Sequence, residues 1–120
     1  MKALNYSFLF FFMLFFISTS AFSGEGVKAN DLYLKGKRHY DKKEFFEAAP
    51  LMKKAAEMGH SDAQMHLAKL YYNGWGIKHD HHKALKWHKK AAAQGNRESQ
   101  KKLKEIKEKQ KNKSPLHHQD

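Results

Sequence analysis

The chain has 120 residues, no cysteine and a formal net charge of +11 at pH 7. This length corresponds to about one small domain. Without cysteine the chain can form neither a disulfide nor a thiolate zinc site, so its stability has to come from packing. The excess of positive charge favours anionic partners, such as an acidic protein, lipid headgroups or nucleic acid.

Residues 1–23 have the order of a secretory signal peptide. Lys2 is followed by an apolar run from Phe8 to Ile17 and then by small residues, with Ala21 and Ser23 in the positions expected before a cleavage site. The run is shorter than the roughly 20 apolar residues of a membrane-spanning helix. We therefore expect cleavage after Ser23, export to the periplasm or to the outside of the cell, and a mature chain that begins at residue 24.

The mature sequence repeats itself at an offset of 36 residues. Residues 48–60, AAPLMKKAAEMGH, align with residues 84–96, ALKWHKKAAAQGN, and share a lysine pair, an alanine pair and a glycine in register. The same offset places Gln64 over Gln100 and Leu67 over Leu103. A repeat of this period is typical of stacked units of secondary structure, and it should be recognised before any motif is interpreted.

The first unit is predicted to consist of two helices. Leu32, Gly36 and Tyr40 recur at helical spacing, and Asp41 with Glu44 is expected to cap the start of the second helix. That helix continues along residues 45–56 and ends at the glycine of residue 59. A short connection therefore joins the two helices.

The second unit follows the same plan with a longer loop. Ser61 and Gln64 have the spacing of a capping box, and the first helix ends before the NGWG loop of residues 73–76. This loop makes the connection four residues longer than in the first unit. Asp80 is the expected N-cap of the next helix, and Gly95 the residue that ends it.

A third unit starts at residue 96 and stops after one helix. Only Leu103 and Ile106 are apolar enough to face inward, and the other residues are mostly charged, as in the terminal capping helix of a solenoid. The sequence thus predicts an all-α repeat domain over residues 24–111, made of two helix pairs and a C-terminal capping helix. Residues 112–120 are predicted to be a disordered tail.

The second unit carries a recognisable motif. Its three segments are Leu67-Ala68-x-x-Tyr71, Gly74-x-Gly76-Ile77-x-x-Asp80 and Lys83-Ala84-x-x-Trp87-x-x-Lys90-Ala91-Ala92-x-x-Gly95. Together they resemble one nearly complete Sel1-like repeat, a variant of the tetratricopeptide (TPR) helix pair, with Ala68 in place of the usual glycine. The resemblance implies a right-handed α-solenoid that acts as an adaptor in protein complexes, often exported in bacteria, with no catalytic residues of its own.

Six side chains are candidate partner-binding residues. Five of them lie off the packed stripe of the first helix of each unit, on the side that can line the concave groove of such solenoids: Tyr33, Lys37, His66, Lys69 and Tyr72. Basic and aromatic groups together suit an acidic or extended protein segment, although a merely solvated face explains them equally well. The sixth, Trp75, either anchors a partner or folds over its own loop, and Trp87 is expected in the core.

The histidines of the sequence HDHH, His79, His81 and His82, raise the question of a metal site. Zinc requires ligands that converge on one point, whereas adjacent histidines on a helix point in different directions. We interpret them as surface histidines and expect neither a metal nor any other cofactor. A weak metal-binding or pH-responsive function through residues 79–82 stays open as an alternative.

No arrangement of serine, histidine and carboxylate points to an enzyme. The lysines of residues 101–113 alternate with glutamates at helical spacing, which indicates a solvated helix that contacts anionic envelope surfaces rather than nucleic acid. The favoured function is a non-enzymatic adaptor for protein complexes at the bacterial envelope, and the alternative is a secreted, host-interacting effector of the same fold. Because solenoids usually need about three repeats to be stable, a partner or self-association is expected to stabilise this one.

Overall fold

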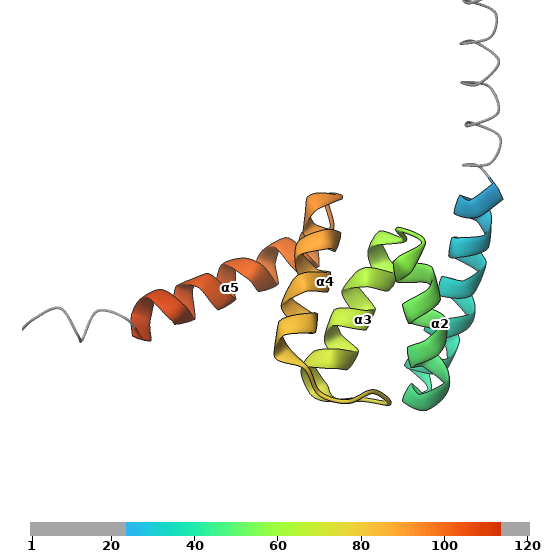
Figure 1. Ribbon diagram of the computed structural model, residues 1–120, viewed down its shortest axis with the longest axis horizontal. Coiled ribbons are helices and arrows are strands. Elements are labelled where there is room, and N and C mark those ends of the chain that lie inside the picture. The colour runs from blue at the N-terminus through green and yellow to red at the C-terminus, as the bar shows by residue number, and fades with distance from the viewer. Residues whose placement is uncertain (1–23, 114–120) are drawn as a thin grey trace, which may run out of the picture.

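The computed structural model describes residues 24–113, so the predicted signal peptide and the end of the predicted tail lie outside the described residues. Residues 24–41 form the N-terminal helix, which is followed by α2 (Phe45–Glu57), α3 (Ser61–Asn73), α4 (His81–Ala93) and α5 (Arg97–Lys113). Between residues 24 and 113 there is no strand. The fold is a short all-α solenoid of two helix pairs and one final helix, as predicted (Figure 1). No helix in this part of the chain is long and apolar enough to cross a membrane.

The N-terminal helix, α2 and α4 end in equivalent turns. Lys43, Gly59 and Gly95, each two residues beyond the end of a helix, have φ angles of 63°, 91° and 92°. In each turn the backbone N–H of the following residue returns to the carbonyl five residues before it, as in a Schellman motif. The left-handed conformation is favourable only for glycine, so Lys43 is held there by its surroundings at a cost in backbone energy.

The predicted capping box at the start of α3 does not form. The N-cap residue is His60, whose ring accepts a hydrogen bond from the N–H of Ala63 at 3.2 Å. Ser61 is the first residue of the helix itself, and Gln64 is buried. The prediction was wrong because serine is the commoner capping residue, and the sequence does not show that the His60 ring is held in place by an aromatic neighbour.

The other two predicted helix starts differ in outcome. Asp41 ends the N-terminal helix and forms an ion pair with Lys37 one turn earlier, while Glu44 stands before α2 without a side-chain capping bond. The predicted cap of Asp41 with Glu44 is therefore wrong. By contrast, Asp80 caps α4 as predicted, with its carboxylate accepting a hydrogen bond from the N–H of Lys83 at 2.9 Å.

The 36-residue register reappears in the hydrogen bonds between units. Gln64 donates from Nε2 to the carbonyl of Ala56 at 3.1 Å, and Gln100 donates in the same way to the carbonyl of Ala92 at 3.1 Å. Gln94 joins the two units, since its Nε2 donates to the carbonyl of Gly59 in the first unit at 3.0 Å and also to Oε1 of Gln64 in its own unit at 2.8 Å. The same polar contact thus joins the second helix of each pair to the helix that follows it, α2 to α3 and α4 to α5.

The core between the helix pairs consists mainly of alanines and contains few large side chains. Its buried members are Ala49, Met52, Ala55, Ala56, Ala63, Leu67, Leu70, Tyr71 and Ala84. Alanine allows close approach of the helices, and the large apolar side chains that are fully buried are Met52, Leu67 and Leu70. Trp87 was expected in the core, but it only packs against it and stays partly exposed, with Nζ of Lys90 4.7 Å from its ring centre.

Candidate interaction groove

A half-open hollow of about 470 Å³ lies between α3 and α5 and extends to the N-terminal helix. It is lined by the first helix of each unit, by the loop after α3 and by one residue of α4. The lining residues are Tyr40, Lys69, Tyr72, Asn73, Trp75, His88, Glu98, Lys101, Lys102 and Glu105. Its volume is within the range of ligand pockets, and its mixture of aromatic and charged groups is typical of a binding surface. We call this hollow the groove.

The loop of residues 74–80 folds back toward α2 (Figure 1), and its Trp75 is one of the lining residues of the groove. Gly76 has a φ of 66°, and a Cβ atom placed on it would lie 2.2 Å from the carbonyl oxygen of Phe45. One residue earlier, the ring of Trp75 stacks on the ring of Phe45 with centroids 4.8 Å apart and an angle of 14°. The long loop therefore contacts the preceding unit, and only a glycine fits at its closest approach.

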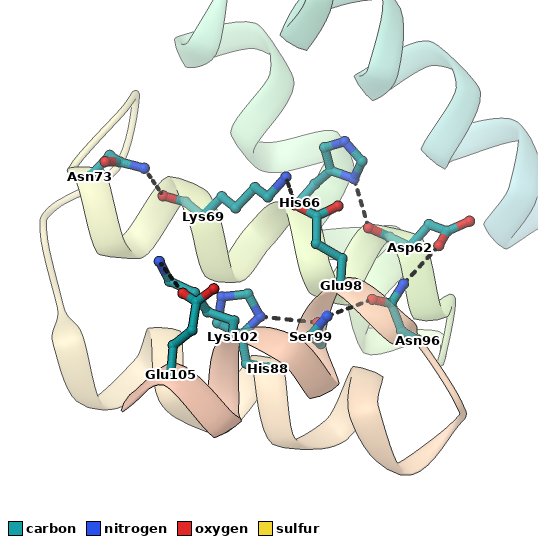
Figure 2. A network of polar contacts seen from close by, with 10 residues as sticks. All are labelled: Asp62, His66, Lys69, Asn73, His88, Asn96, Glu98, Ser99, Lys102 and Glu105. Carbon is teal, nitrogen blue, oxygen red and sulfur yellow. Dashed lines mark hydrogen bonds and ion pairs between the residues drawn. The ribbon is translucent and has the colours of Figure 1, made fainter. Parts of the chain in front are cut away.

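Two ion pairs lie in the groove, one between α3 and α5 and one within α5. Lys69 of α3 forms an ion pair with Glu98 of α5, and this contact holds the pKa of Glu98 below its usual value (Figure 2). Nζ of Lys102 lies 3.8 Å from Oε2 of Glu105 and 5.3 Å from the ring centre of Tyr72. The Lys69–Glu98 pair and the contact of Lys102 with Tyr72 therefore connect α3 to α5 along the groove, whereas Lys102 and Glu105 are paired within α5.

Beneath the charged pairs lies a buried polar pair. Nδ1 of His88 and Oγ of Ser99 are hydrogen-bonded at 3.0 Å, with exposed fractions of 3% and 0% (Figure 2). Burial, together with the nearby charges of Lys102 and Lys69, lowers the pKa of His88 to about 4, and Glu98 opposes this shift. The imidazole is therefore neutral at neutral pH. Because the hydroxyl of Ser99 is inaccessible, the pair cannot act as a nucleophile and its base.

Comparison with known proteins identifies the architecture. The model of the Sel1 repeat family matches residues 21–60 and again residues 61–96. The chain belongs to the Sel1 repeat family. The two matched segments correspond to the two helix pairs, and they confirm the resemblance found in the sequence. Searches of curated proteins and of solved structures found no match. Sel1 repeats are generally non-catalytic modules for protein–protein interaction.

In this Sel1 repeat protein, half of the predicted partner-binding residues lie in the groove. Lys69, Tyr72 and Trp75 line it, with Tyr72 39% and Trp75 40% exposed. Its place in the lining fits the interpretation of Trp75 as a partner anchor, but neither sequence-based interpretation anticipated that its ring packs on Phe45 of the preceding unit. Lys37 is not part of the lining.

His66 does not lie on an exposed face, so that part of the prediction is wrong. It is 6% exposed, and its Nδ1 is hydrogen-bonded to the carbonyl of Asp62 at 2.8 Å. The ring of Tyr40 lies edge-on to the ring of His66 with centroids 4.8 Å apart, and the ring centroid of Tyr33 is 5.7 Å away. Neither His66 nor Tyr33 lines the groove. Burial lowers the pKa of His66 below its usual value. Two tyrosines of the N-terminal helix thus cover a histidine that helical periodicity alone placed at the surface.

Among the groove residues that the sequence interpretation missed are Tyr40, Lys102 and Glu105. The repeat register contains a signal for each of them. Tyr40 precedes Tyr72 by 32 residues, the offset between the first helices of the two units, and Glu105 follows Lys69 by the 36 residues of the main repeat. Extending the register from predicted groove residues to their equivalents would have located all three, since Lys102 follows His66 by the same 36 residues.

The histidines next to the long loop are exposed. His79, His81 and His82 all lie at the surface, and His81 is tilted against the ring of Tyr72 with centroids 5.6 Å apart. Over residues 24–113, no three histidine or carboxylate side chains are grouped in a way that would hold a metal ion.

Proposed function

We propose that this protein is a non-enzymatic adaptor whose groove binds an acidic or extended segment of a partner protein. The observation that carries the proposal is that Tyr72 and Trp75 meet Lys101 and Lys102 in one half-open hollow of about 470 Å³. Aromatic side chains that are partly exposed beside positive charge are typical anchors at protein interfaces. The general role of Sel1 repeats in protein–protein interaction supports this assignment.

The charge balance of the groove favours an acidic segment. Lys69 forms an ion pair with Glu98. The pair of Lys102 with Glu105 is longer, at 3.8 Å, and Lys101 forms no ion pair with the residues that the structure describes. Exposed ion pairs contribute little stability, about 0–1 kcal/mol, so an incoming carboxylate exchanges easily with Glu105. A partner carboxylate would then lie between the two lysines of α5.

The shape of the groove favours an extended segment. Its lining runs from Tyr40 of the N-terminal helix across Tyr72 of α3 to Glu105 of α5, so it crosses all three first helices. A ligand lying along it contacts both repeats and the final helix at once. Such a ligand would also stabilise the stacking of the units, because it binds only when they are stacked.

The order of residues 1–23 supports export, and we place the adaptor at the bacterial envelope, in the periplasm or outside the cell. The positive charge of the chain suits contact with anionic envelope surfaces. Fractionation of cells that produce the protein with a C-terminal tag tests this location. Recovery of a shortened chain from the periplasm or the medium is expected, and an uncleaved chain in the cytoplasm would contradict it. Delivery to a host cell would identify the secreted effector instead.

A photo-crosslinking amino acid at position 72 tests the groove itself. Crosslinked partners are expected from position 72 and not from position 46, where Phe46 is 81% exposed but does not line the groove. The double substitution Lys101→Glu and Lys102→Glu should remove the crosslink, whereas Lys104→Glu with Lys107→Glu, an equal charge change on the same helix, should keep it. Identical partners from both positions would contradict the proposal. If the only crosslinked product is a second copy of the chain, the groove mediates self-association and does not bind a different protein.

A further inference from the structure

A second hollow, of about 330 Å³, lies between the N-terminal helix and α2 and shares no residue with the groove. It is lined by Lys35, Arg38, His39, Lys42 and Leu51. Every lining residue on the N-terminal helix is basic, and the one residue contributed by α2 is apolar. We call it the basic hollow.

Three permanent cations of the basic hollow follow helical spacing: Lys35 and Arg38 lie on one face of the N-terminal helix, and Lys42, the first residue after its end, donates its backbone N–H to the carbonyl of Arg38 at 3.3 Å. Lys35, Arg38 and Lys42 are spaced by three and four residues, so they lie within about 10 Å along the helix axis. None of them forms an ion pair within residues 24–113, whereas His39 is engaged by Glu44, with Nδ1 and Oε2 2.6 Å apart. The three like charges repel one another, and a bound anion would relieve that repulsion.

Leu51 reaches the basic hollow because the two helices approach closely. Gly36 is buried opposite it, and a Cβ atom added to that glycine would lie 3.1 Å from Cβ of Leu51. The missing side chain of Gly36 therefore lets α2 approach and places an apolar surface beside the cations. A site with this composition suits an anionic group that is attached to an apolar one.

We infer that the basic hollow binds a phosphate group, with Lys35, Arg38 and Lys42 on its oxygens and Leu51 against the molecule that carries it. The guanidinium of Arg38 offers parallel donors that match two oxygens of one phosphate, and the two lysines supply point charges on either side. A second copy stacked end to end does not supply this negative charge, because α5 at the other end of the solenoid is itself rich in lysine. The source of the phosphate is either a lipid headgroup or a free phosphate compound.

Titration of the full chain with inorganic pyrophosphate at constant ionic strength, followed by NMR, tests the site. Saturable shifts are expected at the amides of residues 35–42 and 51. The triple variant Lys35→Gln, Arg38→Gln, Lys42→Gln should bind at least about tenfold more weakly, since each cation near a phosphate contributes on the order of a tenfold change or less. The matched triple Lys104→Gln, Lys107→Gln, Lys111→Gln removes equal charge from α5 and should change the affinity less than about twofold.

The proposal is overturned if pyrophosphate does not saturate the chain, or if both triple variants lose affinity equally, because only net charge would then matter. Circular dichroism shows whether each triple variant is folded. If the first one is not, the single variant Arg38→Gln takes its place, with an expected loss of about threefold to tenfold. Crosslinking from position 72 should be unchanged in these variants, so the basic hollow and the groove can fail independently.

Flotation with vesicles separates the two sources of phosphate. The full chain is compared on phosphatidylcholine vesicles with and without phosphatidic acid, and the apolar run of residues 8–17 acts equally on both. A preference for phosphatidic acid that the first triple variant lacks and the control keeps identifies a lipid headgroup. Pyrophosphate binding without such a preference identifies a free phosphate compound.

Discussion

The loop between α3 and α4 is the place where adding a single methyl group should be most damaging. In Gly76→Ala the new Cβ would lie 2.2 Å from the oxygen and 2.3 Å from the carbon of the Phe45 carbonyl, and 2.7 Å from the nitrogen of Phe46. All three are backbone atoms, which cannot rotate away. The loop therefore has to lift from α2.

The expected cost has two parts. A side chain at a φ of 66° costs about 1–2 kcal/mol, and loss of the stacking between Trp75 and Phe45 costs about 0.5–1.5 kcal/mol. Gly76→Ala should thus lower the free energy of unfolding by about 1.5–3.5 kcal/mol. Gly95→Ala is the matched control, because its φ is 92° and nothing lies within 4 Å of the added Cβ, so only the first part applies.

Urea unfolding followed by far-UV circular dichroism measures both variants against the unchanged chain. In a Trp87→Phe background Trp75 is the only tryptophan, and when tryptophan is excited selectively, Gly76→Ala should shift its emission toward that of solvent-exposed tryptophan. The reasoning is refuted if Gly76→Ala costs no more than Gly95→Ala. It is also refuted if the emission of Trp75 does not change.

Three further predictions concern pH and helix ends. The pKa of His88 in the folded state, about 4, is below its value of 6.5 in the unfolded state, so protonation favours unfolding. The free energy of unfolding should therefore fall by on the order of 2 kcal/mol between pH 6.5 and 4. In urea unfolding, His88→Gln should reduce this dependence of stability on pH. Asp80→Ala should lower the urea midpoint because it removes the cap of α4, whereas Asp41→Ala, which removes no cap, should lower it less. Lys43→Gly should raise the thermal midpoint by relieving a φ of 63°, a gain of about 0.5–1 kcal/mol, and an unchanged midpoint would contradict the assigned strain.

The helix pairs could be predicted because most of their signals are local. The alanines of the packed stripes and the glycines after α2 and α4 lie within or beside the helices that they determine, and the 36-residue offset shows that the same signals occur twice. Asp80 was predicted for the same reason, since a cap acts on N–H groups two or three residues away. The Gln64 and Gln100 contacts with preceding carbonyls follow the same register, although their chemistry was not recognised.

The failures involve contacts between distant segments. His60 takes the capping position partly because its ring stacks on Tyr33 of the N-terminal helix, with centroids 4.3 Å apart. His66 is buried by Tyr33 and Tyr40, which precede it by more than 20 residues. Periodicity identifies which face of a helix is polar, but it does not identify the side chains that cover that face.

The four-residue extension of the NGWG loop combines a local sequence signal with a contact between distant segments. The sequence identified its length, and the structure shows its consequence: the loop reaches α2, where Gly76 passes the backbone of Phe45 and Trp75 stacks on its ring. A solenoid with only two helix pairs has few contacts between its units, so a loop that bridges them replaces part of the packing that a further repeat would supply. The same contact positions Trp75, which is one of the lining residues of the groove. Stacking of the units and the shape of the binding surface therefore depend on one short segment, and a change in the loop is expected to alter both together.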